Sequence, residues 1–340
     1  MNKLKYLLLF ILCSHQLWAQ PYSVNSLRWD SSLAQLPEYT FIISGHFYGD
    51  GFNKTHYPAN TILGNIELLN SVDFTLCLGD LYRDVRYDHT FYKKHFYSQL
   101  KKPLLNAVGN HDISGSFYQD FIAPTFYRFK TLGVHHIVLD TELDDSSIEG
   151  EQLNSLKAGI NAFNESTASY LMIYSHRPIW AEEDSVLQRV FSDNTQSDFG
   201  SNFQTDVEPL LQQINSGKQV YWFSGSMGAQ PYAFFYQKRE HIHYAITAIR
   251  GADKDAVLLA HYKDGSLNFQ THSLTGQKLL AFEDYTVDKF TTYEAPLEIN
   301  YRLIPLWVKN TIFHRYFWYG VLVGLLVIFV VMNLKSKLKR

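Results

Sequence analysis

The tetrapeptide Gly109-Asn110-His111-Asp112 groups three side chains that can do chemistry directly after a predicted strand. The apolar run before it, residues 104–108, is typical of a buried strand, and the glycine allows a sharp turn at its carboxyl end. Open α/β sheets bind their ligands at the carboxyl ends of strands. An amide oxygen can ligate a metal, an imidazole can transfer a proton, and a carboxylate can orient that imidazole. The pattern therefore predicts a metal-assisted or acid–base site in this loop.

Three more polar residues come directly after predicted strands. Asp80 follows Gly79, and a carboxylate in that place can hold one metal ion or bridge two. His176 precedes Arg177 and Pro178, whose rigid ring restricts the turn, and His46 follows a first buried strand. These strand ends together predict a metal-centred site, whatever the family of the chain.

The elements Gly79-Asp80, Gly109-Asn110-His111-Asp112 and His176-Arg177-Pro178 stand in an order and at spacings that resemble the calcineurin-like metallophosphoesterases. The resemblance covers about residues 40–250. It implies an α/β fold, a two-sheet sandwich flanked by helices in four layers.

The resemblance also implies roles for these residues. In that family two metals activate water and stabilise charge on phosphorus, and the histidine of Gly-Asn-His-Asp protonates the leaving group. By this analogy Asp80 is the bridging ligand, Asn110 and His176 bind the second metal, and His111 is the general acid. Asp112 is expected to orient His111.

Two of the family's motifs are incomplete in this chain. Ser44-Gly45-His46 stands where the family has Asp-X-His, and Gly225-Ser226-Met227-Gly228 replaces its closing Gly-His-X-His. The metal position that depends on these two motifs keeps only His46 and the bridging Asp80, which it shares with the other position. The other keeps three protein ligands, enough for a catalytic site with open positions. We therefore expect a single divalent ion, and these ligands do not distinguish manganese, iron, zinc or magnesium.

Several further residues are candidates for the site. Arg83 and Arg177 are expected to contact a substrate phosphate, which the guanidinium geometry suits. Asp50 lies close enough in sequence to His46 to replace the missing carboxylate. The pair His241 and His243 shares one face of a predicted strand and could be a displaced His-X-His, although an ordinary core strand is the more common meaning of that position.

Strands and helices alternate along the middle of the chain, which predicts parallel strands joined by crossover helices. The expected strands are 40–44, 73–78, 104–108, 126–129, 134–140, 170–174 and 219–223, and the expected helices are 59–70, 89–102 and 203–214. Short strands follow, with a hairpin turn at Asp264-Gly265.

Both ends of the chain suggest a membrane protein. Residues 1–19 have the basic, apolar and small-residue order of a signal peptide, with an uncleaved anchor as the alternative. Residues 316–334 carry no charge, begin with aromatic residues and precede the basic tail 335–340, as expected of a transmembrane helix of about 20 residues. The positive-inside rule then places the tail in the cytoplasm, giving a single-pass type I protein. The expected domains are an ectodomain, 20–284, and a membrane-proximal connector, 285–315.

Composition sets wider limits. The chain has 340 residues, is 46% hydrophobic and carries a net charge of −3, which gives no basic surface for nucleic acid. Without the signal peptide only Cys77 remains, so no intrachain disulfide can form and the ectodomain depends on its core.

Three functions remain open at this level, and the weakest of them is a one-metal or altered hydrolase that cleaves a different ester. The first is a membrane-anchored extracytoplasmic phosphoesterase, acting on a lipid-linked or glycan-linked phosphoester. The second is a binding or assembly module that keeps the fold but has lost catalysis, which the missing metal ligands favour.

Overall fold

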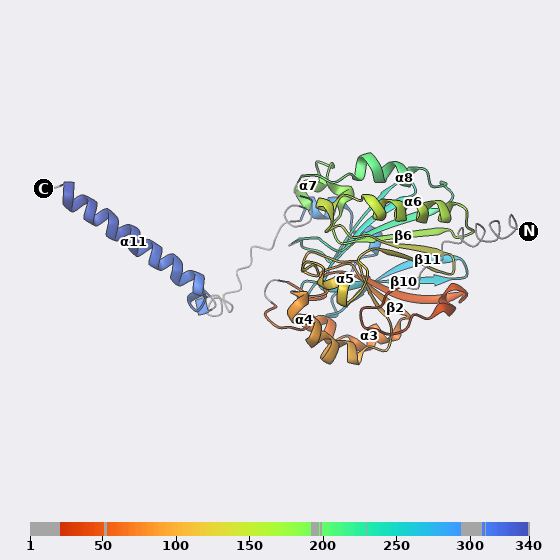
Figure 1. The fold of residues 1–340 in the computed structure, drawn as a ribbon, viewed down its shortest axis with the longest axis horizontal. Helices are drawn as coiled ribbons and strands as arrows, with labels where there is room; N and C mark the ends of the chain where they lie inside the picture. Colours follow the sequence, from red (N-terminus) through yellow and green to blue (C-terminus); the bar gives the residue numbers. More distant parts are fainter. Residues whose placement is uncertain are drawn as a thin grey trace, which may run out of the picture. The chain divides into compact units, whose positions relative to one another are not determined.

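Two mixed β-sheets lie face to face, and helices cover the outer face of each (Figure 1). The computed structural model describes residues 21–50, 53–191, 197, 199–228, 230–293, 308–309 and 311–338. The predicted signal peptide lies outside these residues. The described chain divides into two units that meet between Tyr293 and Glu294.

The first sheet has the strand order β11-β10-β1-β2-β3. Its β1, β2 and β3 are parallel, while β10 runs antiparallel to β1 and forms a hairpin with β11. The hairpin turns at Asp264 and Gly265, both with positive φ, as expected from that dipeptide. The strands are β1 (Glu38–Ser44), β2 (Phe74–Cys77), β3 (Leu104–Asn106), β10 (Ala256–Lys263) and β11 (Ser266–Ser273).

The second sheet has the order β4-β5-β6-β7-β9-β8. Its four central strands are parallel and the two edge strands are antiparallel. Central β5 and β9 are buried along their whole length, as is usual for strands covered on both faces. The strands are β4 (Tyr127–Thr131), β5 (Val134–Val138), β6 (Tyr170–Ser175), β7 (Gln219–Ser224), β8 (Phe234–Arg239) and β9 (Ile242–Thr247).

The helices of the first unit are short except for α6, which packs on the second sheet. Over the first sheet, the expected helix 89–102 consists of an α-helical, a π-helical and a 3-10 segment in succession. The expected helix 59–70 is divided into two short helices at Gly64. The helical segments of the first unit are η1 (Ser31–Ala34), α2 (Asn60–Leu63), α3 (Ile66–Ser71), α4 (Val85–Phe91), η2 (Tyr92–Phe96), η3 (Tyr97–Gln99), α5 (Phe117–Phe121), η4 (Asp144–Ser146), α6 (Gly150–Asn164), η5 (Ile179–Ala181), α7 (Leu187–Val190), η6 (Phe203–Val207), α8 (Glu208–Gln212), η7 (Phe282–Asp284) and α9 (Val287–Thr291).

Three hydrophobic clusters fill the three interfaces between these four layers. One lies between the sheets, one between the second sheet and α6–α8, and one between the first sheet and α3–α5. Their buried members fall between Val24 and Phe290, so residues 21–293 contain a complete core. The predicted four-layer α/β sandwich is confirmed.

The expected connector begins later in the chain than the sequence suggests. Tyr285 packs into the cluster between the sheets and its carbonyl accepts the Tyr236 N–H, while Phe290 packs beside α7. Residues 285–293 therefore belong to the first unit, because their aromatic side chains complete its core.

The second unit contains the helix α11 (Arg315–Leu338). Its stretch Arg315–Met332 is long and apolar enough to cross a membrane, and this is the one such helix among the described residues. The predicted membrane-spanning segment is thus present as a continuous helix.

The two sheets meet closely at the carboxyl ends of β1, β2 and β7, where glycines leave no space for a side chain. A Cβ on Gly225 would overlap the Leu78 carbonyl oxygen, and one on Gly45 would lie 2.8 Å from the Gly225 Cα. A Cβ on Gly79, whose φ is +85°, would lie 2.5 Å from the His176 Nδ1. This glycine junction brings the strand ends of both sheets together.

Replacing Gly225 by alanine is expected to destabilise the fold by about 1–3 kcal/mol or more, because the added methyl group must displace the backbone of Leu78. Urea denaturation of residues 21–293 measures the change. Gly217→Ala is the matched control, since its nearest neighbour is the end of the Asn215 side chain at 3.4 Å. Equal stability of the two variants would contradict the close contact.

Acidification from pH 7 to pH 5 is expected to lower the free energy of unfolding. Burial, with Lys130 nearby, lowers the pKa of His135 to about 3, and burial lowers the pKa of His136 well below its ordinary value. Below pH 6.5 these histidines bind protons in the unfolded chain but stay unprotonated in the folded one. Each therefore lowers the free energy of unfolding by roughly 1–2 kcal/mol at pH 5. Burial raises the pKa of Asp140 to about 6. Its protonation in the folded protein on acidification therefore offsets a smaller part of the stability that the histidines remove.

Urea denaturation at the two pH values checks this loss. His135→Gln should make the pH dependence shallower, whereas substitution of the exposed His95 should leave it unchanged. A protein whose free energy of unfolding at pH 5 equals or exceeds that at pH 7 would contradict this prediction.

Candidate metal centre

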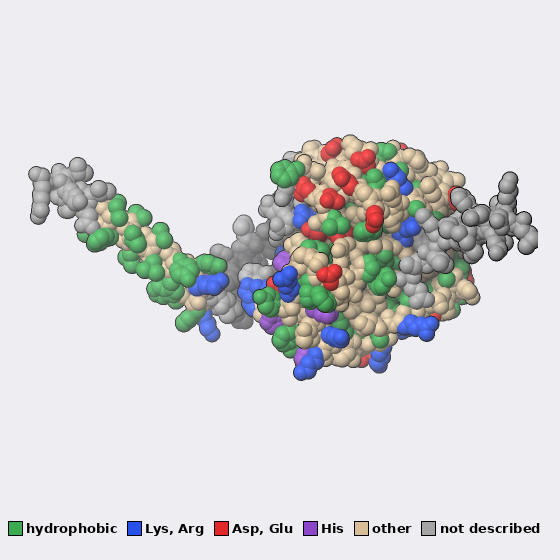
Figure 2. All heavy atoms as spheres, viewed as in Figure 1, with side chains coloured by type: hydrophobic (Ala, Val, Ile, Leu, Met, Phe, Trp, Pro, Cys, Tyr) green, Lys and Arg blue, Asp and Glu red, His purple; other side chains and the backbone are tan. Residues whose placement is uncertain are grey.

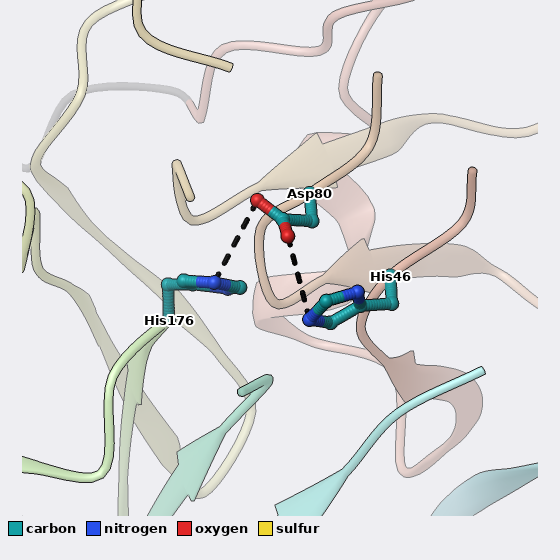
Figure 3. A group of neighbouring side chains, drawn as sticks. All are labelled: His46, Asp80 and His176. Atoms are coloured by element: carbon teal, nitrogen blue, oxygen red, sulfur yellow. Dashed lines mark ion pairs between the residues drawn. The ribbon is translucent and has the colours of Figure 1, made fainter. Parts of the chain in front are cut away.

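Asp80 is the centre of a buried cluster at the glycine junction (Figure 3). It follows β2 with a φ of +53°, and its side chain is almost fully buried. Its carboxylate oxygens lie 3.4 Å from the Nε2 of His46 and 3.6 Å from the Nε2 of His176. The ligand atoms of the three residues lie within 4.8 Å of one another, so both sheets contribute to one site.

His46 approaches Asp80 from the end of β1. Its φ is +57°, and its backbone N–H donates to the Gly79 carbonyl at 2.9 Å. The ring is buried, and neither of its nitrogens has a hydrogen-bond partner among the described residues. Burial lowers the pKa of His46 to about 4 although Asp80 opposes the shift, so the ring is neutral at physiological pH.

His176 approaches from the end of β6 in the second sheet. Its Nδ1–H donates to the Leu78 carbonyl at 2.9 Å, which leaves the lone pair of Nε2 facing Asp80. This Nε2 is buried and has no hydrogen-bond partner within the described part of the chain. A histidine bonded through one nitrogen and directed by the other is the usual arrangement of a metal ligand.

These residues fit a divalent metal ion. Two imidazoles, each with a buried Nε2 that has no hydrogen-bond partner among the described residues, and one carboxylate are a common ligand set for zinc, manganese and iron. Burial raises the pKa of Asp80, but the nearby His176, His46 and His111 outweigh it, so the net pKa lies below its ordinary value and the carboxylate is charged. Of the four predicted ligands, three meet here.

The fourth predicted ligand, Asn110, is exposed in the loop after β3. The next residue, His111, ties this loop to the cluster, because its backbone N–H donates to Asp80 Oδ1 at 3.2 Å. The His111 Nδ1–H donates to the Arg83 carbonyl at 2.7 Å, so Nε2 is the ring nitrogen left to exchange a proton. Tyr48 packs on the same ring, with 4.9 Å between the ring centroids.

Asp112 does not orient His111, contrary to the expectation from the resemblance. Its carboxylate accepts the backbone N–H groups of Tyr82 and Gly109, both at 3.0 Å, and the Asn106 amide at 3.1 Å. It therefore fixes the turn of the loop, while Arg83 orients the imidazole. Burial, with Asp80 nearby, raises the pKa of Asp112 to about 6.

The two predicted substrate arginines are engaged with the protein. Arg177 forms a bidentate pair with Glu142, with both bonds at 2.9 Å, and this pair neutralises its charge. The Arg83 guanidinium donates to the Asn53 carbonyl at 3.0 Å. The structure thus gives both side chains structural partners, which sequence patterns do not reveal.

Arg250, which sequence reasoning missed, is a cation close enough to influence the cluster. The preceding residue, Ile249, donates its N–H to the Gly45 carbonyl at 3.0 Å, placing the Arg250 backbone beside the His46 loop. Its positive charge acts on both His46 and Tyr48. Arg250 follows the end of the parallel strand β9, so the strand-end rule that selected Asp80 could have found it.

The pair His241 and His243, considered above as a displaced His-X-His, does not belong to the cluster of His46, Asp80 and His176. His243 is near the start of β9, and its two ring nitrogens bond to the Tyr236 hydroxyl at 2.7 Å and to Gln219 Oε1 at 2.8 Å. The segment that replaces the family's closing motif instead supports the centre through its backbone, since the N–H groups of Gly225 and Ser226 both donate to the His176 carbonyl.

Comparison with known proteins supports the fold. No protein-family model and no curated protein sequence matches the chain. Among solved structures, the chain is similar to GAP50, the anchor in the inner membrane complex of Plasmodium, with a TM-score of 0.51, 12% identity and coverage of 72% of this chain and 87% of that one.

Two further solved structures match less well. A dimetal phosphatase from Danio rerio has a TM-score of 0.48 and 11% identity, covering 73% of this chain and 100% of that one. Vps29 from Chaetomium thermophilum has a TM-score of 0.29 and 10% identity, covering 69% and 98%. At these identities the comparisons establish the architecture alone.

Substituting Asp80 or His176 is expected to weaken binding of one equivalent of Mn²⁺ or Zn²⁺ by at least about 100-fold, because each removes a buried ligand. Isothermal titration calorimetry on residues 21–293 measures this with Asp80→Asn and His176→Ala. His243→Gln is the matched control, a buried histidine outside the cluster. Unchanged affinity in both cluster variants would contradict the assignment.

Proposed function

We propose that this chain is a membrane-anchored, metal-dependent phosphoesterase with a single metal ion held by His46, Asp80 and His176. The observation that carries the proposal is a buried carboxylate between two buried imidazoles, each with an Nε2 that has no hydrogen-bond partner among the described residues. A divalent ion bound there supplies Lewis-acid polarisation of a phosphoryl oxygen and lowers the pKa of water. Asn110, in the adjacent loop, completes the proposed ligand set.

His111 is the proposed general acid. Its Nδ1–H is fixed by the Arg83 carbonyl, so proton exchange with a substrate takes place at Nε2. Its backbone bond to Asp80 keeps the ring at a constant distance from the metal ligands. Asp112 acts as a positioning residue, because it holds the turn that carries His111.

Arg250 is the group on this chain best placed to bind a substrate phosphate. Its charge acts on His46 and Tyr48 at the cluster, whereas the charge of Arg177 is compensated by Glu142. Arginine suits a phosphate because its planar donors match two oxygens at once.

The proposed topology follows the sequence predictions. A signal peptide (1–19) exports the chain, a helix (316–334) anchors it, and the basic tail (335–340) stays in the cytoplasm. The apolar helix α11 supports the anchor. The substrate is then a phosphoester outside the cytoplasm, with lipid-linked and glycan-linked phosphates as the favoured classes.

A second candidate function is a binding or assembly module without catalysis. The compensated Arg177 and the missing closing histidines favour it, and the similar GAP50 is itself an anchor. The two candidates differ in what His111 does, since a module has no use for a proton donor beside its metal.

Replacing His111 by alanine is expected to lower kcat for alkyl esters of phosphate, whose leaving group must be protonated, by about 10²–10⁴-fold while the metal affinity stays within a few fold. The lost group transfers a proton and binds no metal. Hydrolysis by residues 21–293, titrated with Mn²⁺, measures the effect on a phosphomonoester and a phosphodiester.

His95→Ala, at an exposed histidine, is the matched control and should keep full activity. Metal-independent hydrolysis, or equal rates for wild type and His111→Ala, would contradict the enzymatic proposal. A folded, metal-loaded protein without activity on either ester would favour the binding module.

A further inference from the structure

Three aromatic side chains and three cations gather on the surface formed by α4, η2 and α5, called here the α4–α5 surface. Tyr87, Phe91 and Phe121 are 67%, 39% and 69% exposed. Arg86, Lys93 and Lys94 are exposed among them. Figure 2 shows hydrophobic, basic and histidine side chains together over α4 and α5, at the lower left of the first unit.

The acidic groups of this region are turned inward or bonded locally. Asp88 is 3% exposed and accepts the backbone N–H groups of Arg83 and Asp84 as well as the His56 ring. Asp120 accepts the Ser116 hydroxyl at 2.6 Å. Asp84 and Asp120 are exposed as well, so the three cations leave the α4–α5 surface with a small net positive charge.

The upper part of the first unit, in the same view, has the reverse charge. Acidic side chains gather over α6 and the segments near α7 and α8 in Figure 2. The exposed members are Glu149, Glu151, Glu165, Glu183 and Asp206. This asymmetry gives the unit a preferred orientation toward an anionic surface.

The α4–α5 surface is joined directly to the metal centre. Arg83, whose carbonyl holds His111, stands immediately before the Asp84 cap of α4. The Arg86 guanidinium donates to the Ser114 carbonyl, in the loop that follows His111. A partner that covers this surface therefore lies next to the loop that carries His111.

The surface is also rigid beneath its exposed groups. Val85, Tyr92 and Phe96 of α4 and η2 are fully buried, and Tyr92 donates its hydroxyl hydrogen to the Leu81 carbonyl at 2.8 Å. The exposed aromatic rings are thus presented by a fixed backbone, so docking them requires little reordering.

We propose that the α4–α5 surface docks on an anionic lipid bilayer. Aromatic rings settle at the boundary between headgroups and acyl chains, and lysine and arginine are attracted to anionic headgroups. A bilayer is the favoured occupant because the same chain carries α11, which is apolar enough to span one.

Docking in this way turns the metal centre toward lipid headgroups. Resting on the proposed function, this names the substrate class as a phosphoester carried at the bilayer surface. The docking itself does not depend on catalysis, so the two proposals can fail separately.

Flotation of residues 21–293 with lipid vesicles tests the docking, because this unit contains the complete core and lacks the anchor. One set of vesicles is phosphatidylcholine alone, and the other contains phosphatidylglycerol as about a third of its lipid. Binding is expected to the anionic vesicles, at least about tenfold above the neutral ones, and to weaken at high salt.

Two variants locate the contact. Lys93→Glu with Lys94→Glu, and separately Phe121→Ser, should each reduce anionic-vesicle binding by about tenfold or more while hydrolysis of a soluble phosphoester is unchanged. Lys157→Glu on α6 and Val186→Ser beside α7 are matched controls on the acidic side. Circular dichroism confirms that each variant is folded.

Equal binding to both vesicle types, no binding, or wild-type binding by both surface variants would overturn the docking proposal. Normal docking by a protein that hydrolyses no phosphoester would overturn the enzymatic proposal alone.

Discussion

The absence of side chains at the glycine junction is the constraint on which the site depends. Gly45 and Gly79 end strands of the first sheet, Gly225 ends a strand of the second, and a Cβ at any of them would meet backbone or a ligand histidine at 2.8 Å or closer. Sheets that pack face to face are ordinarily about 10 Å apart. Only where the strand ends converge can one carboxylate reach histidines from both sheets.

This convergence also explains the electrostatics of the centre. Burial alone favours a neutral carboxyl at Asp80, but the His111 N–H and three nearby imidazoles favour the charged form. Burial lowers the pKa of His46 to about 4, against the attraction of Asp80 for a proton on that ring. The result is a buried carboxylate beside two Nε2 atoms that have no hydrogen-bond partner among the described residues, an arrangement that suits a metal ion.

Sequence reasoning predicted the parallel strands, the four layers and the three residues that meet, because strand-end positions follow from local hydrophobic patterns and turn residues. It did not predict what each polar side chain bonds to. Asp112 was expected at the His111 ring but caps the turn at Tyr82 and Gly109, and Arg177 is paired with Glu142 from a different loop. Arg250 follows the end of β9, as the predicted ligands follow other strands, but its closeness to His46 depends on a contact between the two sheets, the Ile249 N–H on the Gly45 carbonyl.

The ligands of the centre come from distant parts of the chain, at positions 46, 80 and 176, and from both sheets. An unfolded chain therefore holds no preformed site, and the ion can be captured only after the two halves of the sandwich have joined. Protein sites discriminate weakly among divalent transition metals by affinity alone, so the ions present where folding finishes have a strong influence on which one is bound. The order of folding thus makes the identity of the metal a property of the compartment as much as of the protein.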